Sequence, residues 1–147
     1  MANHEGAPPP ELSLDLHHVA VVVADLEAAV ARYTALGFGP SERFVVPEQG
    51  VAVVIFRAGP GWVELISPTA ADGPIARFLA KRGEGPHHVA YRVPDLTATL
   101  GQLVAAGVRL IDEVPRRGVH GWRIAFVHPE ACAGVLTELV ETEGDNG

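Results

Sequence analysis

The sequence predicts an α+β fold built from two tandem βαβββ modules, and three observations lead to this prediction. The 147-residue chain is 48% hydrophobic, which is enough to fill a core. Residues 16–38 and 86–108 align without a gap at an offset of 70 and are identical at 10 of 23 positions. Short β-rich runs alternate with helix-like stretches in both halves. Because a solenoid needs more repeats, two fused modules are the better interpretation.

Each copy of the repeat contains the same local signals. A β-rich run (residues 16–23 and 88–93) leads to Asp25 or Asp95, each placed as a helix N-cap. A helix of about 11 residues is expected to follow, and Gly37 and Gly107 occupy the C-cap position. Further strands are expected at 51–57 and 62–66, and at 122–127 and 135–140. Residues 74–82 have helical spacing and predict a helix between the halves.

Composition and organisation restrict the function. We expect a loose tail at 1–13 and one domain at 14–142, with module one at about 14–70, a linker helix at about 72–83 and module two at about 84–142. The net charge of −7 argues against a nucleic-acid partner. The single cysteine excludes an intrachain disulfide, and no apolar run is long enough to span a membrane. A cytoplasmic protein is therefore the default expectation.

Four residues form a candidate metal site. His18 and His88 are equivalent strand residues in the two copies, and Glu64 and Glu138 each lie within an apolar strand. A carboxylate buried in a strand is costly unless it is paired or bound to a metal. Two imidazoles and two carboxylates suit a divalent ion such as Zn, Mn, Co, Ni or Fe. A lone strand His or Glu is usually structural or solvated, but the recurrence in both copies favours metal binding.

The preceding histidines, His17 and His87, point to the other face of their strands. We therefore expect them to lie beside the ligands or to serve in packing, and not to bind the ion.

The repeated unit with His and Glu ligands resembles the vicinal oxygen chelate superfamily, which includes glyoxalase I, extradiol dioxygenases and antibiotic-resistance proteins. Three longer stretches, 48–51 (EQGV), 74–93 and 108–141, resemble the methylmalonyl-CoA epimerase family. The resemblance implies a cupped mixed sheet around a central metal, which is Co, Mn, Zn or Ni, and a homodimer. It places the metal ligands at His18, Glu64, His88 and Glu138; position 64 is Gln in some relatives.

The resemblance also implies the chemistry. Epimerisation at C2 of a methylmalonyl thioester removes a weakly acidic proton, and the resulting enolate, chelated by the metal, must be stabilised. Glu138 is the expected acid or base. Some relatives carry a second catalytic Glu where this chain has Val53. His120 is the candidate substitute, although a surface or CoA-contacting role is equally open, and Glu48 is a weaker candidate.

An acyl-CoA substrate carries phosphates, and five basic residues lie in or near loops: Lys81, Arg82, Arg116, Arg117 and Arg123. Each is alternatively a solvated surface charge. Two other functions stay open. One is another superfamily enzyme, such as a glyoxalase or a dioxygenase; a dioxygenase would use two His and a single carboxylate. The other is a non-catalytic antibiotic-binding protein, which has no need of a metal set.

Overall fold

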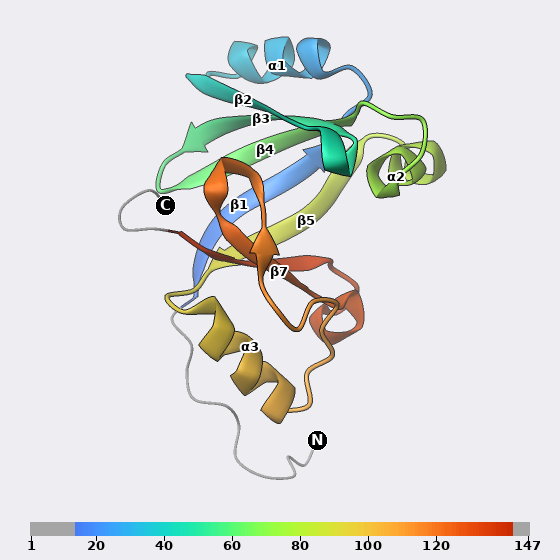
Figure 1. The fold of residues 1–147 in the computed structure, drawn as a ribbon. Helices are drawn as coiled ribbons and strands as arrows, with labels where there is room; N and C mark the ends of the chain where they lie inside the picture. Colours follow the sequence, from blue (N-terminus) through green and yellow to red (C-terminus); the bar gives the residue numbers. More distant parts are fainter. Residues whose placement is uncertain (1–13, 143–147) are drawn as a thin grey trace. The chain divides into compact units, whose positions relative to one another are not determined.

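The computed structural model describes residues 14–142, which form two compact units (Figure 1). The first unit comprises residues 16–90, and the second comprises residues 91–142 with residues 14 and 15. The tail expected at 1–13 lies outside the described residues. In each unit a ten-residue helix packs on one face of the strands, so the predicted α+β class is confirmed.

The strands of the first unit lie in the order β2-β3-β4-β1-β5. Neighbours β2, β3 and β4 are antiparallel, whereas β1 and β4 are parallel, so the sheet is mixed. The elements are β1 (Asp15–Val22), α1 (Leu26–Ala35), β2 (Ser41–Val46), η1 (Pro47–Gln49), β3 (Val51–Ala58), β4 (Gly61–Pro68), α2 (Pro74–Arg82) and β5 (Gly85–Arg92).

The strand register shows that one face of this sheet carries the candidate ligands and the other packs against a helix. Ala20 on β1 and Ile55 on β3 both pair with Glu64 on β4, and His18 pairs with Trp62. Paired residues point to the same side, so all five side chains share one face. The opposite face packs against α1 in a core of Val23, Leu26, Ala29, Val54, Phe56 and Leu65. The helix therefore covers the face that does not carry the candidate ligands.

The second unit contains three antiparallel strands in the order β8-β7-β6. Phe126 on β7 pairs with Glu138 on β8, so they share a face. The residues next to them in sequence, Ala125, Val127 and Leu139, point to the other face. There they pack in a core beneath the helix together with Val93, Leu96 and Leu100. The elements are α3 (Leu96–Ala105), β6 (Arg116–Arg117), η2 (Val119–Gly121), β7 (Arg123–Val127), η3 (Pro129–Cys132) and β8 (Thr137–Glu141).

The predicted helix boundaries are confirmed. The carboxylate of Asp25 accepts a hydrogen bond from Ala28 N at 3.0 Å, and Asp95 accepts one from Ala98 N at 3.0 Å. Both carboxylates satisfy backbone N–H groups that the first helical turn leaves without an intrahelical acceptor. Gly37 and Gly107 follow the helix ends with φ of 108° and 83°, the left-handed region that favours glycine.

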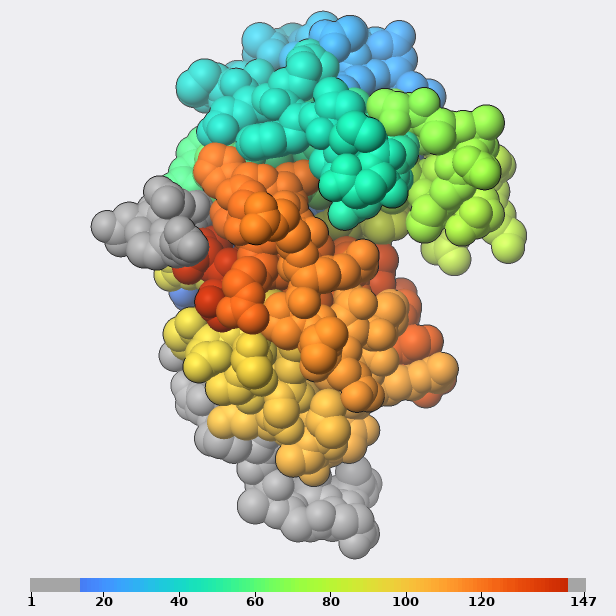
Figure 2. Space-filling view, in the orientation of Figure 1, coloured from blue at the N-terminus to red at the C-terminus, as the bar shows by residue number. Residues whose placement is uncertain are grey.

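The linker helix α2 occupies residues 74–82, as its spacing predicts, and none of its residues is buried. It lies on the surface as the green to yellow-green segment of Figure 2. Between residues 14 and 142, no helix is both long and apolar enough to cross a membrane.

Candidate metal centre

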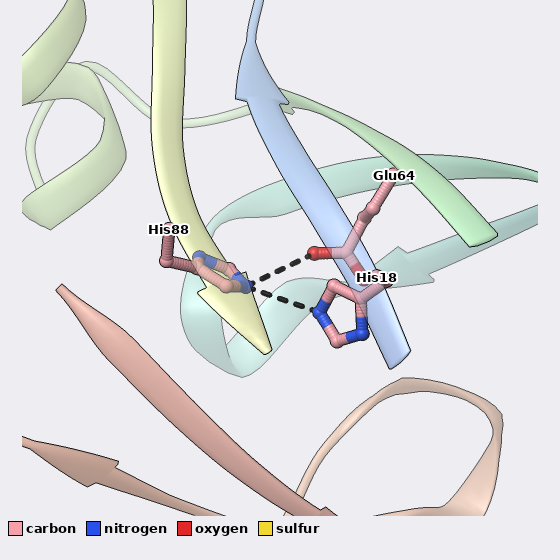
Figure 3. A group of neighbouring side chains, drawn as sticks. All are labelled: His18, Glu64 and His88. Carbon is pink, nitrogen blue, oxygen red and sulfur yellow. Dashed lines mark hydrogen bonds and ion pairs between the residues drawn. The ribbon is translucent and has the colours of Figure 1, made fainter. Parts of the chain in front are cut away.

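Three of the four predicted metal ligands come together in the first unit (Figure 3). His18 on β1, Glu64 on β4 and His88 on β5 each offer one ligand atom, and these atoms lie within 4.8 Å of one another. The Nε2 atoms of His18 and His88 are 3.2 Å apart, and Glu64 Oε1 is 3.8 Å from His88 Nε2. All three residues are buried, with 2 to 5% of their surface exposed.

The spacing of these atoms fits a divalent ion. With metal–nitrogen bonds of about 2.1 Å, two nitrogens 3.2 Å apart subtend an angle of about 100° at the metal, between the octahedral and tetrahedral values. Burial and the neighbouring histidines His18 and His87 hold the pKa of His88 well below its ordinary 6.5. A neutral imidazole keeps a lone pair on one ring nitrogen, so a neutral His88 is suited to bind a cation beside the Glu64 carboxylate.

The histidine before each ligand contacts it through the same ring atom. His17 Nδ1 lies 2.8 Å from His18 Nδ1, and His87 Nδ1 lies 2.9 Å from His88 Nδ1. Burial, and then the positive charge of Arg82, lowers the pKa of His87. Neither preceding histidine belongs to the group whose ligand atoms cluster. Both therefore lie beside the ligands, as the alternation of strand side chains predicts.

The fourth predicted ligand, Glu138, lies in β8 of the second unit and is 5% exposed. It shares a face with Phe126 and points away from α3, just as Glu64 points away from α1. Its place as a ligand and as a catalytic group stays a prediction.

His120 lies in the short helical turn η2 of the second unit, with its ring 5.3 Å from that of Trp122. Its φ of 59° is left-handed, which is uncommon for a residue other than glycine. Its role as the second catalytic group stays a prediction.

The position of the second catalytic Glu in some relatives is apolar in this chain. Val53 is 2% exposed in β3, where it pairs with Phe44 and Ile66 on the face that carries Glu64. Glu48, the weaker candidate, is exposed in η1.

The basic residues proposed to contact phosphates have varied surroundings. Arg116 pairs with Asp112 at 3.3 Å, and Arg123 pairs with Glu141 at 3.3 Å. Lys81 and Arg82 lie in the last turn of α2, and Arg117 is exposed in β6. Two of the five are therefore already engaged in ion pairs.

One contact near the cluster was not anticipated from the sequence. The guanidinium carbon of Arg57 lies 4.5 Å from the ring centre of Trp62, which pairs in register with His18. Period-two spacing in β4 could have found Trp62, because it lies two residues before Glu64 on the same face. The pair flanks the ligands on their own sheet face.

Comparison with known proteins relates the chain to one group. The family model described as Glyoxalase/Bleomycin resistance protein/Dioxygenase superfamily matches residues 17–126. The chain is 40% identical over 141 residues to the mitochondrial methylmalonyl-CoA epimerase of Bos taurus, covering 95% of this chain and 81% of the relative. The crystal structure of methylmalonyl-CoA epimerase from Mycobacterium tuberculosis is similar with a TM-score of 0.82 and 38% identity, covering 88% of both chains.

A solved methylmalonyl-CoA epimerase in complex with methylmalonyl-CoA and NH4+ has a TM-score of 0.83 and 36% identity, covering 91% of this chain and 97% of that chain. These similarities span most of the chain, including the residues of the buried cluster.

Proposed function

Because this chain belongs to the methylmalonyl-CoA epimerase family of the glyoxalase superfamily, we propose that it interconverts (R)- and (S)-methylmalonyl-CoA at C2. The observation that carries the proposal is a relative of this activity that is 40% identical along 95% of the chain. The buried His18, Glu64 and His88 cluster adds a site whose chemistry suits the reaction.

The proposed cofactor is a divalent ion, which is Co, Mn, Zn or Ni. We propose that His18, Glu64 and His88 bind it and that Glu138 is the fourth ligand. Two imidazoles and two carboxylates form a donor set that all four ions accept. When bound, the ion supplies a Lewis acid that stabilises negative charge on the substrate oxygens.

The proton transfers are assigned to residues of this chain. Glu138 accepts the proton from C2; the C–H bond breaks and its electron pair moves into the enolate. His120 returns a ring proton to the opposite face of C2. Solvent then takes the proton held by Glu138 and returns one to His120, so both residues regain their starting forms. The overall change is an isomerisation, so no oxidant or reductant is required.

The remaining parts of the proposal concern partners. The substrate is an acyl-CoA, and Lys81, Arg82 and Arg117 are the basic residues proposed to meet its phosphates because they are exposed or lie at the end of α2. A homodimer and a cytoplasmic location stay predictions that rest on the resemblance and on composition.

One experiment tests the function directly. The protein is incubated with Co²⁺ and a single epimer of methylmalonyl-CoA in deuterated water. We expect racemisation together with incorporation of one deuterium at C2, because the proton returned comes from solvent. A substrate that stays a single, unlabelled epimer at high protein concentration would overturn the proposal.

A further inference from the structure

The two pairs of adjacent histidines in the repeat, His17–His18 and His87–His88, have the same geometry. The rings of His17 and His18 have centroids 5.0 Å apart and an interplanar angle of 74°, and the rings of His87 and His88 have values of 5.1 Å and 76°. In each pair the two Nδ1 atoms are within hydrogen-bond distance, at 2.8 and 2.9 Å. The arrangement is therefore built twice, on β1 and on β5, at positions 70 residues apart.

An Nδ1–Nδ1 hydrogen bond requires one nitrogen with a proton and one without. A neutral imidazole carries its proton on only one nitrogen, so this bond determines which nitrogen of each ring keeps a lone pair. If His18 Nδ1 donates to His17 Nδ1, the Nε2 atom of His18 has its lone pair exposed toward Glu64 and His88. The reverse direction places a proton on His18 Nε2, where it would oppose a cation.

We infer that His17 and His87 are positioning residues that each accept the Nδ1 proton of the following histidine and so aim its Nε2 lone pair at the metal. The inference rests on the metal site of the proposed function and assigns to it two residues that lie outside the ligand cluster. Outer partners of this kind fix both the tautomer and the ring orientation of a ligating histidine.

Burial adds to this orienting role. His17 is 2% exposed, so its ring is held by the surrounding structure. His87 is partly buried, and its ring packs edge-on against Phe78 of α2 with centroids 5.0 Å apart. A fixed acceptor restricts rotation of the ligand ring about its side-chain bonds, which lowers the entropy lost on metal binding.

Two substitutions at each position distinguish the effect of losing the hydrogen-bond acceptor from the effect of changing the size of the side chain. Asn places an amide oxygen close to the position of histidine Nδ1 and retains an acceptor, whereas Leu has a similar size and no acceptor. Co²⁺ affinity is measured by competition with a chromophoric chelator for His17→Leu, His17→Asn, His87→Leu and His87→Asn. His128→Leu is the control, since that ring accepts from Glu130 N in the second unit.

We expect each Leu variant to bind Co²⁺ about 10 to 100 times more weakly than the wild type, with most of the loss restored by Asn. The His128→Leu control should bind Co²⁺ as the wild type does. Leu variants with wild-type affinity, or Asn variants as weak as Leu, would overturn the inference while leaving the metal site intact. A wild-type protein that binds no divalent ion would instead overturn the metal site itself, and with it the positioning role of His17 and His87.

A spectroscopic measurement tests the direction of the bonds independently. In the Zn²⁺-loaded protein, two-bond proton–nitrogen NMR correlations of the histidine rings should show His17 and His87 protonated at Nε2 and unprotonated at Nδ1. Protonation of either residue at Nδ1 contradicts the proposed direction at that pair.

Discussion

Glu64 is a buried carboxylate of the first unit and one of three candidate metal ligands there. It is 5% exposed and lies 3.8 Å from a histidine ring that the low pKa of His88 keeps neutral. Glu64→Ala should therefore lower Co²⁺ affinity by at least about tenfold, because a charged ligand is lost. Glu64→Gln should retain part of the affinity, since an amide oxygen can still coordinate. Chelator competition measures both, and an unchanged affinity in the alanine variant would exclude Glu64 as a ligand.

The proposed acid and base are tested through turnover. Glu138→Gln should abolish epimerisation, because an amide cannot accept the C2 proton. Deuterium incorporation in single-epimer substrate is the measurement. Glu130→Gln is a matched control, since Glu130 is exposed and pairs with Arg109 at 3.3 Å. A Glu138→Gln variant as active as the control would remove this residue from the mechanism.

His120→Ala should lower turnover by about 10² to 10⁴-fold, the range typical of losing a general acid or base. Folding is checked by circular dichroism of the variant. Full turnover in His120→Ala would show that another group returns the proton.

The lowered pKa of His88 predicts how the stability of the metal-free protein depends on pH. In the unfolded chain the ring binds a proton near its ordinary pKa of 6.5, whereas in the folded chain it does so only at lower pH. Below pH 6.5 the unfolded state therefore binds more protons, and the free energy of unfolding falls as pH falls through this window, by up to about 1.4 kcal/mol per pH unit.

Urea unfolding of chelator-treated protein at pH 7.5 and 5.5 measures this dependence. His88→Asn should show a smaller loss than the wild type. Thr99→Val, which removes a hydrogen bond to Asp95 O in α3, should be less stable while keeping the wild-type dependence. Identical pH dependence in wild type and His88→Asn would contradict the prediction.

At the scale of elements, the close approach of β4 to β1 depends on Gly61. A Cβ at this position would lie 2.9 Å from the carbonyl oxygen of His17, which belongs to backbone and cannot rotate away. Gly61→Ala should displace β1 beside His18, lower the free energy of unfolding by about 1 to 3 kcal/mol and weaken Co²⁺ binding. Urea unfolding and chelator competition measure the two effects.

Gly101 in α3 is the matched control for Gly61. A Cβ there meets nothing within 4 Å, and the residue is helical and exposed. Gly101→Ala should raise the free energy of unfolding by about 0.5 to 1 kcal/mol and leave metal affinity unchanged. If both alanines stabilised the protein, the proposed conflict at Gly61 would be wrong.

The elements that could be predicted are those with strong local signals. Asp25 and Asp95 each begin a helix because a carboxylate caps the first turn, and β3 is visible as a run of apolar residues. The weaker elements lie at the edges: β2 is largely exposed and pairs only with β3 in its unit, and β6 has two residues. These two edge strands form through backbone pairing with one neighbouring strand, and such pairing does not require an alternating hydrophobic pattern in the sequence.

At the scale of the whole molecule, metal binding should stabilise the fold, because the ligands come from three strands that are distant in sequence. An ion at 100 times its dissociation constant adds about 2.7 kcal/mol, which corresponds to a rise in Tm of about 10 °C. Calorimetry with and without Co²⁺ measures the shift. Glu64→Ala should show a much smaller rise, and equal rises in the two proteins would place the ion elsewhere.

The repeat allowed the modules and the residues of the buried cluster to be predicted, since His18 and His88 recur at equivalent positions and Glu64 interrupts an apolar strand. The contacts around them could not be predicted. The Nδ1 contacts of His17 and His87 depend on ring rotation, and the stacking of Arg57 on Trp62 depends on register between strands. Neither is encoded in the spacing of residues along one strand.

One face of β1 and β4 packs against α1 and the other carries the candidate ligands, and this separation affects which substitutions the protein can tolerate. Residues that pack beneath α1 and residues on the face of the candidate ligands His18 and Glu64 alternate along the same strands. A substitution at position 18 or 64 changes the face that carries the candidate ligands while the helix-covered core keeps its side chains. New chemistries can therefore be tried on this scaffold one residue at a time, without first rebuilding what keeps it folded.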